Sequence, residues 1–202
     1  MSDAETAPEG EENKPDVSIE DRIRAGLYGL LGVVLTEAPD AEQLMQISAM
    51  RPNESPLGQA MGLLSKIATV TTPAAAAAEY KTLFGSILKP VASAHVADKA
   101  GYAAALEATN ARLGITPFEG YDEPADHIAA LCDTMASLIM SQHNEGLSPE
   151  DQKVFFTAHI APWAGKFFES MEGKRTAKFY GPVGTLGKEL VASDIVYCGN
   201  GG

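Results

Sequence analysis

The stretch SIEDRIRAGLYGLLGVVLT, residues 18–36, decides the fold class of this 202-residue chain. Ser18, with Asp21 three residues later, resembles a capping box that starts a helix, and Pro39 would end it. Apolar side chains recur at the spacing of one helix face, at Ile23, Leu27, Leu30, Leu31, Val34 and Leu35. The stretch therefore predicts an amphipathic helix. Its three glycines, which weaken the helix by up to about 1 kcal/mol each, would let another helix approach closely; they are Gly26, Gly29 and Gly32.

The same stretch superficially resembles a signal peptide, because Arg22 and Arg24 precede an apolar run over residues 27–35. However, acidic residues crowd the upstream side, and residues 36–40 (TEAPD) make a poor cleavage site. The run is also shorter than the roughly 20 apolar residues that cross a membrane. We therefore expect a core helix of a cytoplasmic protein with no stable membrane insertion.

Helix start signals recur along the rest of the chain, with candidate N-caps at Asp40, Ser55, Thr72 and Ser148. They predict helices over about 41–50 and 56–70, from Pro73 to Phe84, over about 94–113, from Pro124 to near residue 144, and from Pro149. Residues 86–93 are expected to form a loop. The last helix, from about Phe179, should be kinked or should start late because it contains Gly181-Pro182.

Glycine and proline mark where several of these helices should end. Gly85 and Gly114 fit the position after a helix C-terminus, and Pro162 should interrupt the helix that contains Phe155. No stretch alternates apolar and polar residues in the manner of a strand. The sequence predicts an all-α protein with a single globular domain of about eight or nine helices over residues 18–196. Residues 1–17 should form a disordered acidic tail and residues 197–202 a flexible one.

The charge of the chain excludes one class of partner. The formal net charge is -12, and residues 1–17 contain six carboxylates against one lysine. An acidic surface repels phosphates, so nucleic acid is not expected as a partner. It would attract a basic peptide or protein, although acidity also serves solubility alone.

Enzymatic and metal-binding signatures are absent from the sequence. The two cysteines, Cys132 and Cys198, are far apart and form no zinc pattern, which suits a reducing compartment. The four histidines are scattered, and no paired E-x-x-H motifs of a di-iron bundle occur. The chain also has no G-x-S-x-G, H-E-x-x-H or phosphate-loop motif. We therefore expect neither an enzyme nor a metal site.

Three tracts resemble the TorD/DmsD family of molybdoenzyme maturation chaperones. The first is Tyr80-x-x-Leu-Phe-Gly with Lys89-Pro90 after it, and the second is Glu123-Pro-x-Asp-His-Ile at residues 123–128. The third is Phe155-x-x-x-His-Ile-x-Pro-Trp at residues 155–163, followed by a leucine-rich last helix. Their order and spacing are similar to the family over roughly residues 20–195. The second tract is the most specific of the three.

The resemblance implies an all-helical, cytosolic chaperone. Such proteins bind the twin-arginine leader and the apo-catalytic subunit of a DMSO-reductase-type enzyme, and they delay its export until the molybdopterin cofactor is inserted. The resemblance also implies no tightly bound cofactor, with weak guanine nucleotide binding reported for some members, and either a monomer or a homodimer.

The candidate leader-binding residues surround the second tract: Tyr121, Asp122, Glu123, Pro124, Asp126 and His127. If Pro124 opened the helix, Glu123 would be its N-cap and Asp126 would stabilise its first turn, worth about 0.3–1 kcal/mol without any ligand. A carboxylate beside an apolar groove would instead complement a leader, which carries two guanidinium groups beside an apolar stretch. The residues leave both interpretations open, and the resemblance favours binding.

Secondary candidates are Tyr80, His159 and Trp163. The residues by themselves favour a packing role for Trp163, the only tryptophan, and for Tyr80, whereas His159 fits either role. Three alternatives to a leader-binding chaperone remain at this stage. They are an assembly chaperone for a non-exported, membrane-bound reductase, a nucleotide-binding regulator, and a helical scaffold that matches the family by accident.

Overall fold

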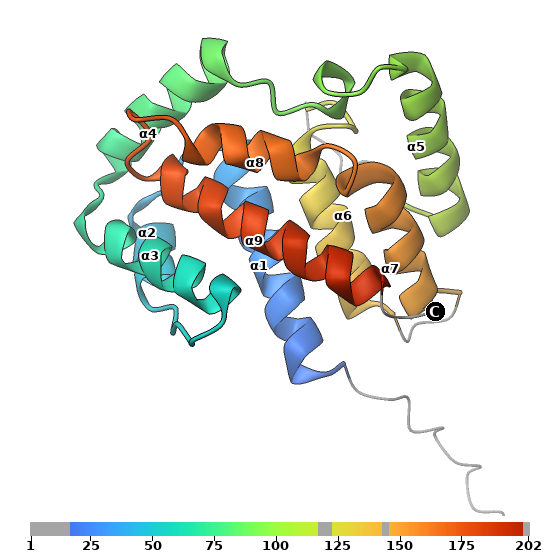
Figure 1. Ribbon diagram of the computed structural model, residues 1–202, viewed down its shortest axis with the longest axis horizontal. Helices are drawn as coiled ribbons and strands as arrows, with labels where there is room; N and C mark the ends of the chain where they lie inside the picture. The colour runs from blue at the N-terminus through green and yellow to red at the C-terminus, as the bar shows by residue number, and fades with distance from the viewer. Residues whose placement is uncertain (1–16, 117–122, 143–145, 200–202) are drawn as a thin grey trace, which may run out of the picture.

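The computed structural model describes residues 17–116, 123–142 and 146–199, and within them the chain forms a helical domain (Figure 1). The helices are α1 (Ile19–Thr36), α2 (Ala41–Ser48), α3 (Pro56–Val70), α4 (Pro73–Thr82), α5 (Lys99–Leu113), α6 (Ile128–Met140), α7 (Pro149–Phe155), α8 (Ala164–Glu172) and α9 (Tyr180–Gly199). Short π-helical turns follow α4 and α7, at Leu83–Ile87 (η1) and Phe156–Ile160 (η3), and a 3-10 turn spans Ala92–Ala94 (η2). The all-α prediction is confirmed.

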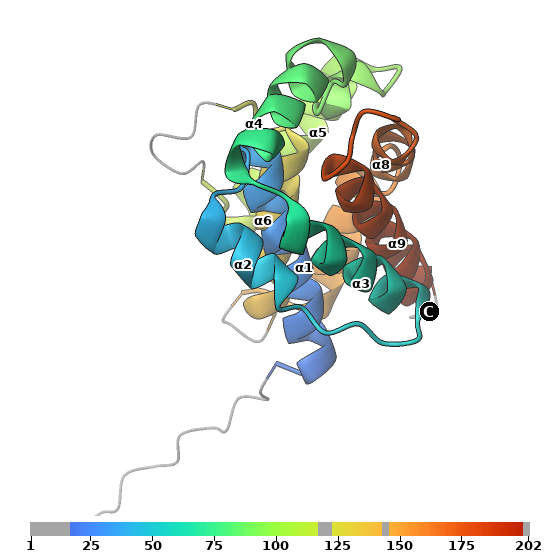
Figure 2. The same cartoon turned by 90° about the vertical axis from the view of Figure 1, so that its left-hand side faces the viewer.

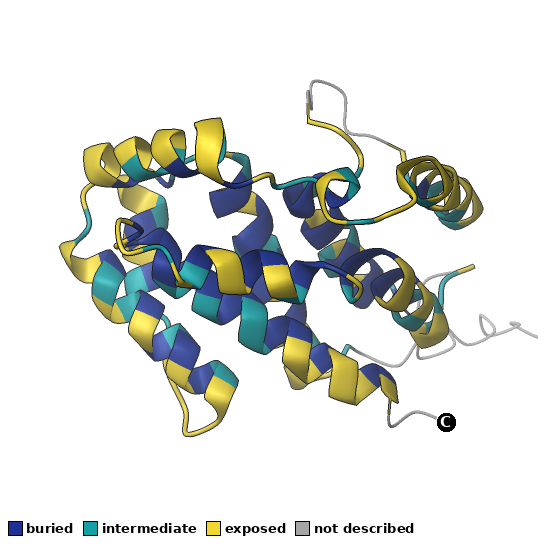
Figure 3. Ribbon diagram, turned by 45° about the horizontal axis from the view of Figure 1, so that its top comes forward, coloured by how far each residue is buried: buried dark blue, intermediate teal, exposed yellow. Residues whose placement is uncertain are grey.

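Helix α1 lies at the centre of the fold, as its pattern predicts. It packs along α6 on one side, and α8 and α9 cross in front of it in Figure 1. Helices α2 and α3 pack against each other beside α1, at the side that faces the viewer in Figure 2. Figure 3 shows buried residues turned toward the centre and exposed ones on the outer faces of α4 and α5. None of the helices in the described residues is long and apolar enough to span a membrane.

The N-caps predicted for α1 to α4 are confirmed in the structure. The hydroxyl of Ser18 accepts a hydrogen bond from the backbone N–H of Asp21 at 3.0 Å. Asp40 and Gln43 form a reciprocal capping box at α2. Ser55 and Thr72 cap α3 and α4 in the same way as Ser18. These caps satisfy backbone donors that a helix start leaves open, typically worth about 1 kcal/mol each.

Helices α1 and α6 run antiparallel. The Asp133 side chain of α6 lies against Gly32 of α1, where an added Cβ would be 2.0 Å from its Oδ1. Near the other end of the pair, Gln142 Nε2 donates to Asp21 Oδ2 at 3.1 Å. The C-terminus of α1 and the N-terminus of α6 therefore lie at the same end of the bundle. Close approach was predicted for three glycines of α1, and Gly32 alone shows it.

Five predicted boundaries differ from the structure. Gly85 does not end a helix, because the chain continues into η1 and Leu88 N–H bonds to Leu83 O at 2.8 Å. Helix α5 begins at Lys99 rather than near residue 94, since the side chain of Asp98 caps it.

Helix α6 starts at Ile128, not Pro124, and ends at Met140, short of residue 144.

Helix α9 extends to Gly199 through residues expected in the flexible tail, where the ring of Tyr197 lies 4.3 Å from the guanidinium of Arg24. Gly181-Pro182 lies in the first turn of α9, which starts at Tyr180, so the helix start is not delayed past the proline; a proline in a first turn breaks no hydrogen bond of the helix. The predicted break at Pro162 agrees with the gap between η3 and α8. The acidic tail up to residue 16 lies outside the described residues.

Candidate functional site

The Glu123–His127 segment forms a bent connection into α6 instead of a first helical turn. His127 takes an extended backbone conformation (φ −67°, ψ 137°) and is itself the N-cap of α6. Its neighbours pair with the loop after η1, through Ile128 N–H to Pro90 O at 2.7 Å and Ala92 N–H to Asp126 O at 2.9 Å. The helical start predicted at Pro124 is wrong because these long-range hydrogen bonds hold the chain extended.

Asp126 joins two distant segments of the chain. Its side-chain Oδ2 accepts a hydrogen bond from Ser93 N–H at 2.8 Å, at the start of η2. The predicted role in the first turn of α6 is therefore wrong, since Asp126 precedes the cap. We name this junction, residues 90–93 paired with residues 124–128, the clasp. As a residue, Asp126 is half-buried.

His127 belongs to the core of the clasp. Its side chain is buried, and Nδ1 accepts a hydrogen bond from Ala129 N–H at 3.2 Å. Burial lowers the pKa of His127, and the nearby carboxylates of Glu123 and Asp126 oppose that shift only in part. The imidazole is thus neutral at pH 7, and its 3.9 Å approach to Glu123 is not a charge pair there. His127 shapes the segment and does not present a charge to a ligand.

Glu123, Pro124 and Ala125 are the exposed residues of the segment. Glu123 holds a carboxylate on the surface at the end of the bundle where α1 ends and α6 begins. Tyr121 and Asp122, which we also predict as binding residues, lie outside the described residues. The structure therefore brings Glu123, Asp126 and His127 together and gives them unequal access to a partner.

The three secondary candidates all have structural partners. Trp163 is buried, and its Nε1 donates to His159 O at 2.9 Å. Its ring stacks on His95, with ring centroids 5.0 Å apart, and His95 Nε2 bonds to Lys89 O, so Trp163 supports the loop of the clasp. The Tyr80 hydroxyl donates to Thr36 O at 2.6 Å and so closes the C-terminus of α1.

His159 is also buried and contacts α5, where Nε2 lies 2.9 Å from Thr109 Oγ1. Burial lowers the pKa of His159, so this side chain is neutral at pH 7. Its Nδ1 has no hydrogen-bond partner. The contacts of His159 and Trp163 favour packing over direct binding.

Sequence reasoning missed a buried ionic network between α1 and α9. Arg24 makes two hydrogen bonds to Asp194, from Nε to Oδ1 at 2.9 Å and from Nη2 to Oδ2 at 3.1 Å. Tyr28 donates its hydroxyl to the same carboxylate at 2.8 Å, and Arg24 Nη1 lies 2.6 Å from Asp21. The signal available in the sequence was an arginine inside an apolar helix. Every charge here has a partner, so the network fixes α1 against α9.

The described residues contain no group of three or more His, Cys, Asp or Glu side chains that could hold a metal ion. The candidate site presents the exposed carboxylate of Glu123 beside the clasp, an arrangement that suits reversible binding of a cationic partner. A sequence model of a protein family, described as nitrate reductase delta subunit, matches residues 51–169, which include the whole clasp. No curated protein matches the sequence.

Proposed function

Because the chain belongs to the nitrate reductase delta subunit family of molybdoenzyme assembly chaperones, we propose that it binds the apo-catalytic subunit of a DMSO-reductase-type enzyme and its twin-arginine leader. The chaperone would act in the cytoplasm, keep the apo-subunit open for molybdopterin insertion and delay its export. Binding is reversible and involves no covalent chemistry, which is consistent with a family of assembly factors rather than catalysts.

The position of Glu123 is the observation that carries the leader-binding part of the proposal. Its carboxylate is exposed, whereas its neighbours Asp126 and His127 are held by the clasp. Leader arginines can pair with such a carboxylate, and an exposed ion pair contributes about 0–1 kcal/mol, with more expected where the bound leader shields the pair from water. Asp126, half-buried beside it, adds a second negative charge.

A second candidate client is a membrane-bound, non-exported nitrate reductase. The description of the matching family favours it, because it names a nitrate reductase subunit. The two candidates differ in what the chaperone recognises. An exported client offers a twin-arginine leader, whereas a non-exported one offers another part of its catalytic subunit.

Calorimetric titration tests the proposal directly. The protein is titrated with the leader peptide of the molybdoenzyme encoded nearest to it, and with the same peptide carrying alanine at both arginines. We expect a Kd on the order of 1 μM or tighter for the leader, equivalent to about −8 kcal/mol, and weaker binding of the alanine peptide. If neither peptide binds but the intact apo-subunit does, the client is the non-exported type.

Glu123→Gln provides the matched test of the site. It removes one charge from an exposed side chain, so the fold should be unaffected, and leader affinity should fall about three- to tenfold, or about 0.7–1.4 kcal/mol. Glu169→Gln, on the exposed face of α8, is the control with the same chemical change. Equal affinities of the two variants would place the leader elsewhere on the protein.

A further inference from the structure

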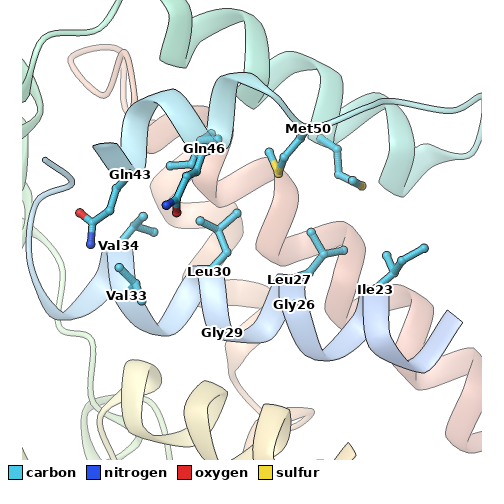
Figure 4. A pocket seen from close by; sticks show the side chains of 12 residues that line it. Ile23, Gly26, Leu27, Gly29, Leu30, Val33, Val34, Gln43, Gln46 and Met50 are labelled. Atoms are coloured by element: carbon cyan, nitrogen blue, oxygen red, sulfur yellow. The ribbon is translucent and has the colours of Figure 1, made fainter. Parts of the chain in front are cut away.

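An open apolar groove lies between α1 and α2, with its far wall completed by Met61 of α3. Its volume is about 470 Å³. Figure 4 shows Leu30 and Val34 projecting from α1 toward α2, and Gln46 projecting back from α2. The lining residues are Ile23, Gly26, Leu27, Gly29, Leu30, Val33, Val34, Gln43, Gln46, Ile47, Met50 and Met61. Among the described residues no charged side chain lines the groove, and only two lining side chains are polar, Gln43 and Gln46, so the groove favours an apolar part of a ligand.

Two glycines of the groove are not explained by packing within the chain. A Cβ added at Gly26 or Gly29 would meet no atom within 4 Å, whereas one added at Gly32 would collide with Asp133. Glycine in a helix lowers helix stability by roughly 1 kcal/mol relative to alanine. At Gly26 and Gly29, no close contact among the described residues requires a glycine and so offsets this loss. Their effect is to bare the backbone of α1 and to deepen the groove.

Large apolar side chains are exposed along the same surface. Ile23 is 50% exposed at one end of the groove and Val33 41% at the other. Large apolar side chains left exposed around a groove favour a partner that covers them. Methionines beside the groove, such as Met50, adapt their shape to a partner more readily than branched residues.

The dimensions of the groove suit a short helix. The stretch of α1 from Ile23 to Val33 is about 15–17 Å long at 1.5 Å per residue. A helix of the same length has about three turns, and the bare backbone at Gly26 and Gly29 would let it come close. Laying the apolar face of a helix into such a groove is a common mode of peptide recognition.

Within residues 25–50 the charged side chains gather at one end of the groove, whereas the other end, at Ile23, has charges of both signs in Glu20, Asp21, Arg22 and Arg24. The segment from residue 25 to residue 50 has no lysine or arginine, and its three carboxylates, Glu37, Asp40 and Glu42, are all exposed. Glu37 and Asp40 lie in the connection between α1 and α2, and Glu42 lies in the first turn of α2, next to Gln43 of the groove. Glu123 lies at the same end of the bundle, because α6 starts where α1 ends. We name the end marked by Glu37, Asp40 and Glu42 the acidic end.

We propose that the α1–α2 groove binds the apolar stretch of the client's leader as a short helix, with the cationic end of the leader at the acidic end. The inference rests on the proposed function and extends it. All but one of the lining residues precede residue 51, where the family match begins, so the family match does not account for this groove. The two halves of a leader, one cationic and one apolar, would then have separate subsites.

Filling the groove tests the apolar subsite. Gly29→Leu adds a side chain where a Cβ meets open space, and leucine favours a helix more than glycine does, so the fold should be kept. We expect the affinity for the leader peptide to fall at least tenfold while Tm stays equal or rises. Ala104→Leu, on the exposed face of α5, adds a comparable side chain away from the groove and should bind the leader normally.

A double-mutant cycle tests the orientation. The variant with both Glu37→Gln and Glu42→Gln should bind the wild-type leader about fivefold or more weakly. Its affinity for the alanine leader should be unchanged, because the two carboxylates are expected to interact with the leader arginines. Glu20→Gln is the matched control, because Glu20 is exposed near the other end of α1. If Glu20→Gln lowered the affinity for the wild-type leader as much as the Glu37 and Glu42 substitutions do, the proposed orientation would be wrong.

The outcomes separate this inference from the proposed function. If the leader binds wild type and Gly29→Leu equally well, the groove inference is wrong and the proposed function stands. If the leader does not bind wild type at all, both fail. Sedimentation measures self-association, and titration measures leader affinity. If Gly29→Leu loses self-association but keeps its leader affinity, the groove binds a second copy of the chain and the inference is overturned. Displacement of a bound apolar dye without leader binding would assign it to a small ligand, with the same consequence.

Discussion

The substitution Asp194→Asn tests how the central helix is held in place. Asp194 is fully buried and accepts two hydrogen bonds from Arg24 and one from Tyr28. Asparagine has nearly the same shape and keeps an oxygen acceptor, so the substitution removes the negative charge with little change in packing. The positive charge of Arg24, only 9% exposed, then loses its main partner.

The expected loss follows from the burial of this pair. Removing one partner of a buried ion pair costs about 3–5 kcal/mol, because the remaining charge cannot return to water. Arg24 keeps two weaker partners, the carboxylate of Asp21 at 2.6 Å and the ring of Tyr197 at 4.3 Å. We therefore expect the free energy of unfolding to fall by about 3 kcal/mol, the lower end of that range.

Urea denaturation, followed by the fluorescence of the buried Trp163, measures the change. Arg112→Met is the control, because Arg112 pairs with Asp151 at 2.6 Å but its side chain is 52% exposed. An exposed pair contributes about 0–1 kcal/mol despite its shorter distance. Comparable losses in the two variants would refute the reasoning that burial, and not distance, sets the size of the effect.

The double variant Arg24→Met with Asp194→Leu provides an independent check. Replacing both charges with apolar side chains removes the cost of burying either one, so much of the stability lost in Asp194→Asn should return. A double variant as unstable as Asp194→Asn would show that the hydrogen-bond geometry, rather than an uncompensated charge, stabilises α1 against α9.

Two further predictions follow from the packing and the burial. Gly184→Ala should lower the free energy of unfolding by about 1–3 kcal/mol in the same assay, because the new Cβ would lie 2.7 Å from the backbone of Phe168 and of Glu172 and force α8 and α9 apart; unchanged stability would contradict this close crossing. NMR titration should place the pKa values of His127 and His159 below 6.5, so the unfolded chain binds more protons and these residues destabilise the protein as pH falls through 6.5. A pKa at or above 6.5 for either histidine would contradict the conclusion that its buried imidazole is neutral.

Much of the helical architecture is readable from local sequence. The caps at Ser18, Asp40, Ser55 and Thr72 were predicted because a side-chain oxygen beside a helix start needs no distant partner. The core position of α1 was predicted because its apolar residues repeat at the helical period.

The sequence singled out the candidate segment but not its shape. The pattern of residues 123–128 identified the segment, and the helix predicted from Pro124 would have included His127. Its extended conformation depends on hydrogen bonds to Pro90 and Ala92, more than 30 residues earlier in the chain. No local signal announces such a contact, so the start of α6 was placed four residues early.

By itself, the sequence determined the all-α fold class, most helix starts and the identity of the candidate segment, because these follow from local hydrogen bonding and hydrophobic period. Only the tertiary structure decided which of those residues are accessible. It buried His127, used Asp126 to join two loops, paired Arg24 with Asp194 and left the groove at Gly29 open. The physical reason is that burial and ion pairing depend on which helices meet, and that is set by contacts between residues far apart in the chain.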